Sequence, residues 1–182
     1  MKKNIFVVAL ILLTFSLSVN AQKEANTSLK WYSWEEGYQL AQDEGKIIIL
    51  DAYTDWCHWC KVMDDKTYSQ KSVIDLIDAD FVAIKLNPEK AGTYTYNGAN
   101  YSGKSLINTL SYSKFSGYPT TFFVFPSTSE SYMEVGYLEA SVFEGKLKKY
   151  AAMKNESDGN GKGKEKGKTV KEKGKSKVKI NN

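Results

Sequence analysis

The two cysteines of the chain, Cys57 and Cys60, belong to one Cys-His-Trp-Cys sequence. They follow an apolar run typical of a buried strand, and they open a segment with a helical pattern. At the start of a helix, unpaired backbone N–H groups favour a thiolate, and a second cysteine one turn later is close enough for a disulfide. An attacking thiolate and a neighbouring thiol that resolves the mixed disulfide are the groups that thiol–disulfide exchange requires, so the spacing predicts this chemistry.

Other roles compete for this motif. A static disulfide would close so short a loop that it would stabilise the fold little. Metal binding would use both cysteines and His58, with soft thiolates favouring copper(I), but the chain has no further cysteine or histidine to complete a site. Covalent haem attachment requires a histidine after the second cysteine, where this chain has Lys61. We therefore expect neither a metal nor an organic cofactor, and a copper-holding module stays open as an alternative.

Helices and strands alternate around the motif and must position it. Two capping boxes, Ser33 with Glu36 and Ser141 with Glu144, predict helix starts. Apolar runs predict strands over 46–53, 81–86, 120–125 and 132–137. The remaining patterns predict a loop over 91–103 and helices over 34–44, 57–67, 72–77, 105–115 and from Ser141 onward. The alternation predicts a layered α/β domain with a mostly parallel sheet and an antiparallel edge from the closing hairpin.

Residues 1–21 are typical of a secretory signal peptide. Lys2 and Lys3 precede an almost continuous apolar run over 5–19, and Val19-Asn20-Ala21 supplies the small residues of a cleavage site. The apolar run is shorter than the roughly 20 residues of a membrane-spanning helix, so a cleaved signal is favoured over an anchor. We expect a periplasmic or secreted protein, whose thiols meet oxidising conditions.

Charge is distributed unevenly along the chain, although 25 lysines and 21 acids leave a net charge of only +4. Every basic residue is lysine, which argues against a site built on bidentate recognition of phosphates or bases. Residues 154–182 hold ten lysines, four acids and no aromatic residue. This composition predicts a disordered, solvated tail, and the alternative is a basic arm that touches an anionic surface without binding nucleic acid specifically. The domain between signal and tail, 22–153, has a net charge of −4.

Four motifs, in order along residues 46–150, resemble the thioredoxin superfamily. They are the strand-to-active-site run over 49–57, the next strand over 83–87, the Gly117-Tyr118-Pro119-Thr120 loop, and the last strand and helix from Val135. The flanking residues of the cysteine motif look most like an exported, bacterial thioredoxin-like branch. The resemblance implies a thioredoxin fold, a central mixed sheet flanked by helices, with an insertion over 88–116 before the cis-proline loop.

The resemblance also implies roles for four residues in catalysis. Cys57 would be the attacking nucleophile, and Cys60 the more buried, resolving thiol. Asp51 would be a buried acid that takes and returns the proton of Cys60, with a pKa that burial raises towards neutrality. Lys85 would pair with Asp51 and tune it. A turn-capping aspartate and a solvated lysine remain the alternatives for the last two.

Five further residues would surround the cysteine pair. Pro119, if cis, would place the backbone of Tyr118 beside the disulfide, where an extended substrate can pair. Trp56 would belong to an apolar docking surface, or else to the core. His58, as imidazolium, would stabilise the thiolate, or else would face solvent. Trp59 stands where many thioredoxins have proline, which leaves the redox potential and the direction of reaction open.

The sequence thus predicts an exported thiol–disulfide oxidoreductase that exchanges disulfides with protein substrates and has a membrane or periplasmic redox partner. The alternative is a non-catalytic thioredoxin-fold module that holds copper or a protein partner, with the lysine-rich tail as an adhesion arm. Three of the tyrosines in the insertion either line a partner groove or cover the sheet: Tyr94, Tyr96 and Tyr101.

Overall fold

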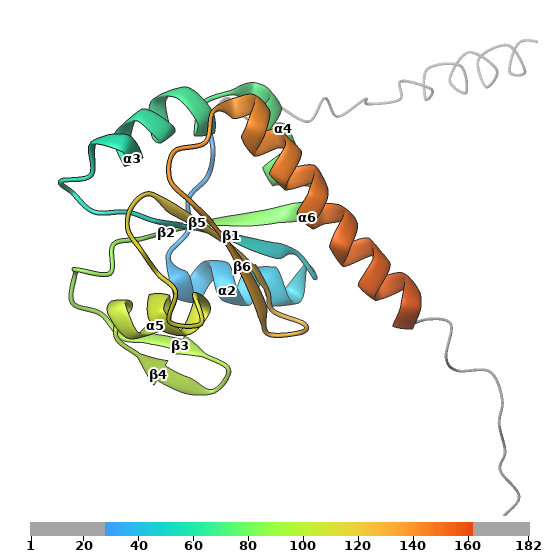
Figure 1. The fold of residues 1–182 in the computed structure, drawn as a ribbon. Helices are drawn as coiled ribbons and strands as arrows, with labels where there is room; N and C mark the ends of the chain where they lie inside the picture. Colours follow the sequence, from blue (N-terminus) through green and yellow to red (C-terminus); the bar gives the residue numbers. More distant parts are fainter. Residues whose placement is uncertain (1–27, 162–182) are drawn as a thin grey trace, which may run out of the picture.

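A four-stranded mixed sheet forms the centre of the computed structural model, which describes residues 28–161 (Figure 1). The predicted signal peptide, and the part of the predicted tail beyond residue 161, lie outside these residues. The strand order is β2-β1-β5-β6, with β1 parallel to β2, β5 antiparallel to β1 and β6 antiparallel to β5. The strands are β1 (Ile47–Ala52), β2 (Phe81–Leu86), β5 (Thr120–Phe125) and β6 (Glu130–Val135).

The mixed sheet confirms the fold that the resemblance implies, whereas the mostly parallel sheet predicted from the alternation is wrong. Leu86 at the end of β2 and Thr120 at the start of β5 both pair with Ala52. The connection between β2 and β5 therefore leaves and re-enters the sheet at the same end, which makes β5 antiparallel. The ends of β1 and β2 and the start of β5 consequently meet at one end of the sheet.

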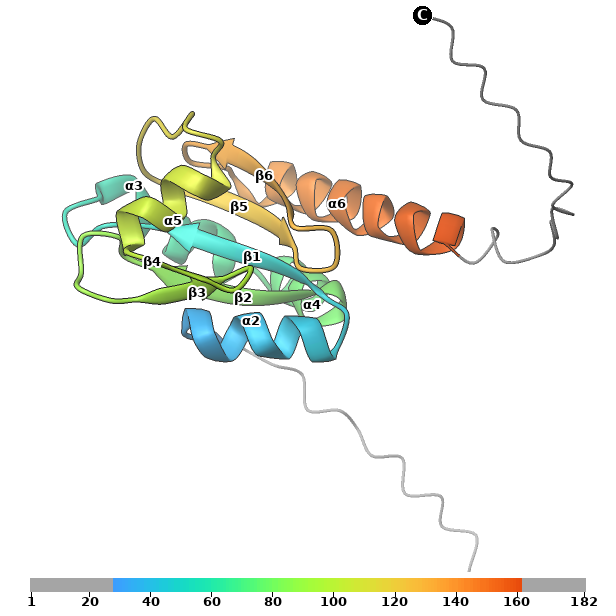
Figure 2. The same ribbon diagram turned by 90° about the horizontal axis from the view of Figure 1, so that it is seen from below.

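Each face of the sheet supports its own hydrophobic core. Every residue of β1 is buried, and alternate side chains point to opposite faces. Ile48 and Leu50 belong to the core that α2 (Trp34–Asp43) and α5 (Gly103–Leu110) cover. Ile47 and Ile49 belong to the core on the other face, beneath α3 (His58–Met63), α4 (Lys71–Asp80) and α6 (Ala140–Gly161) (Figures 1 and 2).

Helix boundaries follow the local sequence signals only in part. Ser33 and Glu36 form the predicted capping box of α2. The capping box predicted for Ser141 and Glu144 is absent. Helix α6 already begins at Ala140, and the Ser141 hydroxyl donates to the Glu139 carboxylate. A π-helical turn, Asp64–Tyr68, extends α3. Helix α6 continues past the predicted domain boundary at 153, and no helix within 28–161 is long and apolar enough to span a membrane.

The insertion is more regular than predicted. The segment expected to be a loop contains a hairpin of β3 (Tyr94–Tyr96) and β4 (Ala99–Tyr101), turned at Asn97-Gly98, where both residues have positive φ. The helix predicted over 105–115 ends at Leu110, because the chain takes positive φ at Tyr112 and Ser113.

Three tyrosines of the insertion, Tyr94, Tyr96 and Tyr101, cover the sheet. Tyr96 is buried and donates its hydroxyl hydrogen to the Ser129 carbonyl, and Tyr94 and Tyr101 pack against the same core. The indole of Trp34, in α2, donates to the Thr95 carbonyl. The hairpin is thereby fixed to the first helix of the domain, which favours the covering role over a partner groove.

We predict that Leu106→Ala lowers the free energy of unfolding by about 2 to 5 kcal/mol, because the leucine side chain is fully buried and its removal leaves a cavity. Lys104→Ala, at an exposed position of the same helix, is the matched control and should change stability by less than about 0.5 kcal/mol. Urea denaturation measures both. Equal stability of the two variants would show that the insertion is not part of the folded core.

Candidate redox site

The cysteine pair lies in the turn between β1 and α3, as a disulfide with a Cα–Cα distance of 5.4 Å. Cys57 is the N-cap of α3, and its sulfur accepts a hydrogen bond of 3.1 Å from the Cys60 backbone N–H. The two residues are equally buried, 4% and 3% exposed, so burial in this oxidised form does not distinguish the attacking from the resolving sulfur. The two sulfurs differ in that the Cys57 sulfur accepts this backbone hydrogen bond, and a backbone donor aimed at a sulfur favours its thiolate.

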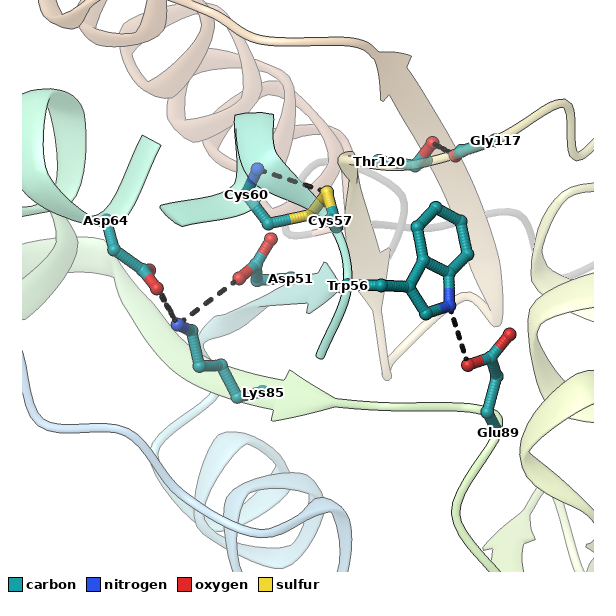
Figure 3. The surroundings of a disulfide bond; sticks show 9 residues. All are labelled: Asp51, Trp56, Cys57, Cys60, Asp64, Lys85, Glu89, Gly117 and Thr120. Atoms are coloured by element: carbon teal, nitrogen blue, oxygen red, sulfur yellow. Dashed lines mark hydrogen bonds and ion pairs between the residues drawn. A yellow bond between two sulfur atoms is a disulfide. The ribbon is translucent and has the colours of Figure 1, made fainter. Parts of the chain in front are cut away.

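Asp51 lies near the end of β1 and is 1% exposed. Figure 3 shows its carboxylate between the disulfide and the Lys85 ammonium. Burial raises the pKa of the Asp51 carboxyl to about 7, the positive charge of Lys85 opposes the rise, and the negative charge of Asp64 adds to it. The carboxyl is therefore able to take up or release a proton near neutral pH, as the sequence predicted.

Lys85 is shared by two carboxylates. Its ammonium lies 3.7 Å from the Asp51 carboxylate but 2.5 Å from each oxygen of Asp64. The rings of Trp31 and Tyr53 lie 5.0 Å and 5.2 Å from the same ammonium. The predicted Lys85–Asp51 pair is thus present, but Asp64 is the closer partner and holds part of the lysine charge away from the buried acid.

Buried polar atoms without a partner are concentrated in this part of the chain. Within the described residues, only three buried side-chain oxygens lack a hydrogen bond: both carboxylate oxygens of Asp51 and the hydroxyl of Thr54. Folded proteins rarely leave such groups unsatisfied, and those that do often use them for function. All three atoms belong to residues that precede Cys57 by at most six positions, which makes the turn into α3 the candidate functional site.

Aromatic side chains surround the disulfide on the exposed side. The Tyr118-Pro119 peptide bond is cis, as predicted. The Trp56 side chain is 67% exposed, so it is not part of the core, and its ring meets Tyr118 edge-on at 5.8 Å. Its indole nitrogen donates to the Glu89 carboxylate at 3.0 Å (Figure 3). Trp56 thus belongs to a surface, as the docking interpretation requires.

His58 and Trp59 occupy the first turn of α3, between the two cysteines. His58 faces solvent and lies 5.7 Å from the Trp59 ring, edge-on. Trp59 is 55% exposed and packs against Tyr137, which follows β6. Trp59 therefore joins the cysteine motif to the segment that follows the edge strand β6. Within residues 28–161, no group of three or more His, Cys, Asp or Glu side chains is arranged to hold a metal ion.

The sequence reasoning does not identify Asp64 or Glu89. Asp64 follows Cys60 by one helical turn, a spacing that places both side chains on one face and is a usable signal. Glu89 lies three residues after the last residue of β2, at the end of the sheet where β1 also ends. Its contact with Trp56 depends on the sheet order, which the residue pattern alone does not fix.

A disulfide held between a central strand and a helix start, close to a cis-proline, is typical of thioredoxin-fold proteins, and solved structures similar to this chain share that fold. A thioredoxin from Thermus thermophilus superposes with a TM-score of 0.57 and 22% identity, over 75% of this chain and 97% of that one. A putative disulphide-isomerase from Bacteroides thetaiotaomicron gives a TM-score of 0.51 and 26% identity, over 68% and 91% of the two chains.

Residues 12–152 match the Thioredox_DsbH family, described as a protein of unknown function, DUF255, and the chain belongs to this family. An uncharacterised protein from Caenorhabditis elegans is 35% identical over 69 residues, which are 37% of this chain and 10% of that protein. The human spermatogenesis-associated protein 20 is 30% identical over the same length. The chain thus matches about a tenth of the length of these curated relatives.

Proposed function

We propose that the protein is a thiol–disulfide oxidoreductase that exchanges disulfides with protein substrates through a mixed disulfide at Cys57, resolved by Cys60. The observation that carries this proposal is the disulfide at the start of α3 above a buried, unsatisfied Asp51 carboxyl. A pKa of about 7 allows this carboxyl to exchange a proton with a neighbouring thiol at neutral pH.

The reaction in the reducing direction has two sulfur transfers. The Cys57 thiolate attacks a substrate disulfide, a bond forms between Cys57 and one substrate sulfur, and the second substrate sulfur leaves as a thiolate. Cys60 then gives its proton to Asp51 and attacks the Cys57 sulfur. The first substrate sulfur leaves as a thiolate that takes up a proton, and the protein remains oxidised. The oxidising direction is the reverse sequence.

The comparisons support the class of reaction. The family carries the name DsbH, and the Bacteroides relative is described as a putative disulphide-isomerase. We further propose that this protein acts in the periplasm or outside the cell, as the sequence over 1–21 predicts, and that a membrane or periplasmic partner resets its cysteine pair. The direction of the reaction then follows from the potential of that pair against its partner.

The test is reduction of insulin by dithiothreitol, followed by turbidity, with and without the purified protein. We expect a clear acceleration at substoichiometric protein. A lack of acceleration combined with stoichiometric copper(I) uptake would favour the non-catalytic module instead. The reduction potential of the Cys57–Cys60 pair assigns the direction: a value of about −270 mV indicates a reductase, and one of about −120 mV an oxidase.

A further inference from the structure

Trp56 presents an exposed aromatic surface directly beside the reacting cysteine. Its side chain is the most exposed of the large hydrophobic residues in the part of the chain that the structure describes. The ring does not stand alone, because Tyr118 meets it edge-on and Phe115 packs edge-on against Tyr118 at 5.0 Å. Trp56, Tyr118 and Phe115 form what we call the aromatic strip.

Glu89 fixes the orientation of this strip and gives it a charge. One of its carboxylate oxygens accepts the indole N–H of Trp56, and its backbone N–H donates to the Asn87 side chain. Among residues 28–156, no lysine or histidine forms an ion pair with Glu89. Burial, followed by the negative charge of Glu89, raises the pKa of the Tyr118 hydroxyl, which places that charge next to the strip.

The other charged groups near the strip are a paired acid, two residues on α3, and Lys114, which is exposed next to Phe115 in the chain. Asp55 is paired with Lys90 at 3.4 Å, so the acid adjacent to Trp56 in the chain is already neutralised. His58 and Lys61 are exposed on α3. Figure 3 places Trp56 and Glu89 on one side of the disulfide, and Lys85 and Asp64 on the other. Glu89 is therefore the acid at the strip that no lysine or histidine of residues 28–156 pairs with.

We infer that Glu89 and Trp56 form a binding site for a cationic side chain, lysine or arginine, that stands next to the reacting cysteine of a protein substrate. The inference rests on the proposed function and names the substrate class of the same site. A cation over the indole face is attracted by the ring, and the free oxygen of the Glu89 carboxylate accepts a charge-assisted hydrogen bond from it.

Distance and overall charge both suit this assignment. Consecutive Cα atoms are about 3.8 Å apart, so a residue within one or two positions of a cysteine bound to Cys57 reaches Trp56. The domain over 22–153 carries a net charge of −4, which attracts cationic segments over a longer range. An acidic flanking residue would instead meet the Glu89 carboxylate and be repelled.

The experiment compares three peptides that differ only in the residue beside a single cysteine: lysine, glutamine or glutamate. Each cysteine carries 5-thio-2-nitrobenzoate as a mixed disulfide, and the reduced full-length protein releases the chromophore in a single turnover. Each rate is divided by the rate with dithiothreitol, a neutral thiol, to remove intrinsic differences in reactivity. We expect the lysine peptide to react about fivefold faster than the glutamine peptide, and the glutamate peptide to react slowest.

Two variants test whether Glu89 causes the preference for the lysine peptide. Glu89→Gln keeps an oxygen for the Trp56 indole but removes the charge, and the lysine preference should fall to about one. Glu35→Gln removes an exposed acid on α2, away from the strip, and should keep the preference. An unchanged preference in Glu89→Gln, or equal rates of the lysine and glutamine peptides with wild type, would overturn the cation site while leaving the exchange reaction in place. Failure of all three peptides to react would overturn the proposed function itself.

Discussion

Replacing Cys57 with serine is expected to lower disulfide exchange at least about 10³-fold, because a hydroxyl at neutral pH supplies almost no anion to attack a disulfide. The same substitution at Cys60 should have a different result. Cys57 can still attack, but no second thiol resolves the product, so the substrate remains bound to the protein. The two variants therefore separate the two sulfur transfers, although both remove the same disulfide.

The measurement is mass spectrometry and non-reducing electrophoresis after mixing each reduced variant with a disulfide substrate. Cys60→Ser should accumulate a covalent adduct that dithiothreitol releases, and Cys57→Ser should accumulate none. The reverse outcome, with the adduct on Cys60, would show that the hydrogen bond from the Cys60 N–H to the Cys57 sulfur does not mark the nucleophile. Equal adducts on both cysteines would mean that neither has a preferred role.

Local sequence signals predict the elements whose structure depends mainly on their own residues. Strands β2 and β5 lie where the apolar runs predict them, because each is buried almost throughout, Asn87-Pro88 follows β2, and a proline stands on each side of β5. Asp51 precedes Cys57 by six residues in one strand–turn segment, so its place beneath the disulfide depends on few other contacts. The Asn97-Gly98 turn also carried a local hairpin signal, but the surrounding glycines and polar residues predict a loop equally well.

Contacts between segments that lie far apart in the chain could not be predicted from local sequence signals. The closer partner of Lys85 is Asp64, 21 residues earlier in the chain, and Glu89 meets Trp56 across 33 residues. Both contacts depend on which strands lie side by side and in which direction. The orientation of β5 depends on where the chain re-enters the sheet after the insertion, and the hydrophobicity of β5 is the same for either orientation.

Asp51→Asn is expected to make the oxidised protein more stable at alkaline pH and slower in exchange. The native carboxyl has a pKa of about 7, against 3.8 for the ordinary group, so the native state holds one more proton than the unfolded state between these values. Stability therefore falls as pH rises from about 4 to about 7, and above that range the buried charge costs about 4 kcal/mol. Asparagine carries no charge and removes this cost.

Urea denaturation at pH 4 and pH 8.5 measures the stability part of this prediction. Relative to wild type, Asp51→Asn should gain about 4 kcal/mol between the two pH values, because all other titrating groups are common to both proteins. An equal pH dependence of wild type and variant would show that the carboxyl is already ionised in the acid range. Asp64→Asn tests how strongly Lys85 affects the pKa of Asp51. This substitution removes a negative charge near Asp51 and frees the Lys85 ammonium to pair with Asp51, so the pKa of Asp51 should fall.

The activity of Asp51→Asn should change in the opposite direction from its stability. Without a proton acceptor for Cys60, resolution of the mixed disulfide should slow by about 10²-fold at pH 7, at the lower end of what general acid–base catalysis contributes. Rapid-quench trapping of the mixed disulfide measures this step. If Asp51 served only for packing, replacing it would lower the stability of the protein. We expect instead that the variant is more stable and resolves the mixed disulfide more slowly. That combination is what a charge buried for catalysis predicts, and a variant that loses both would assign Asp51 a structural role.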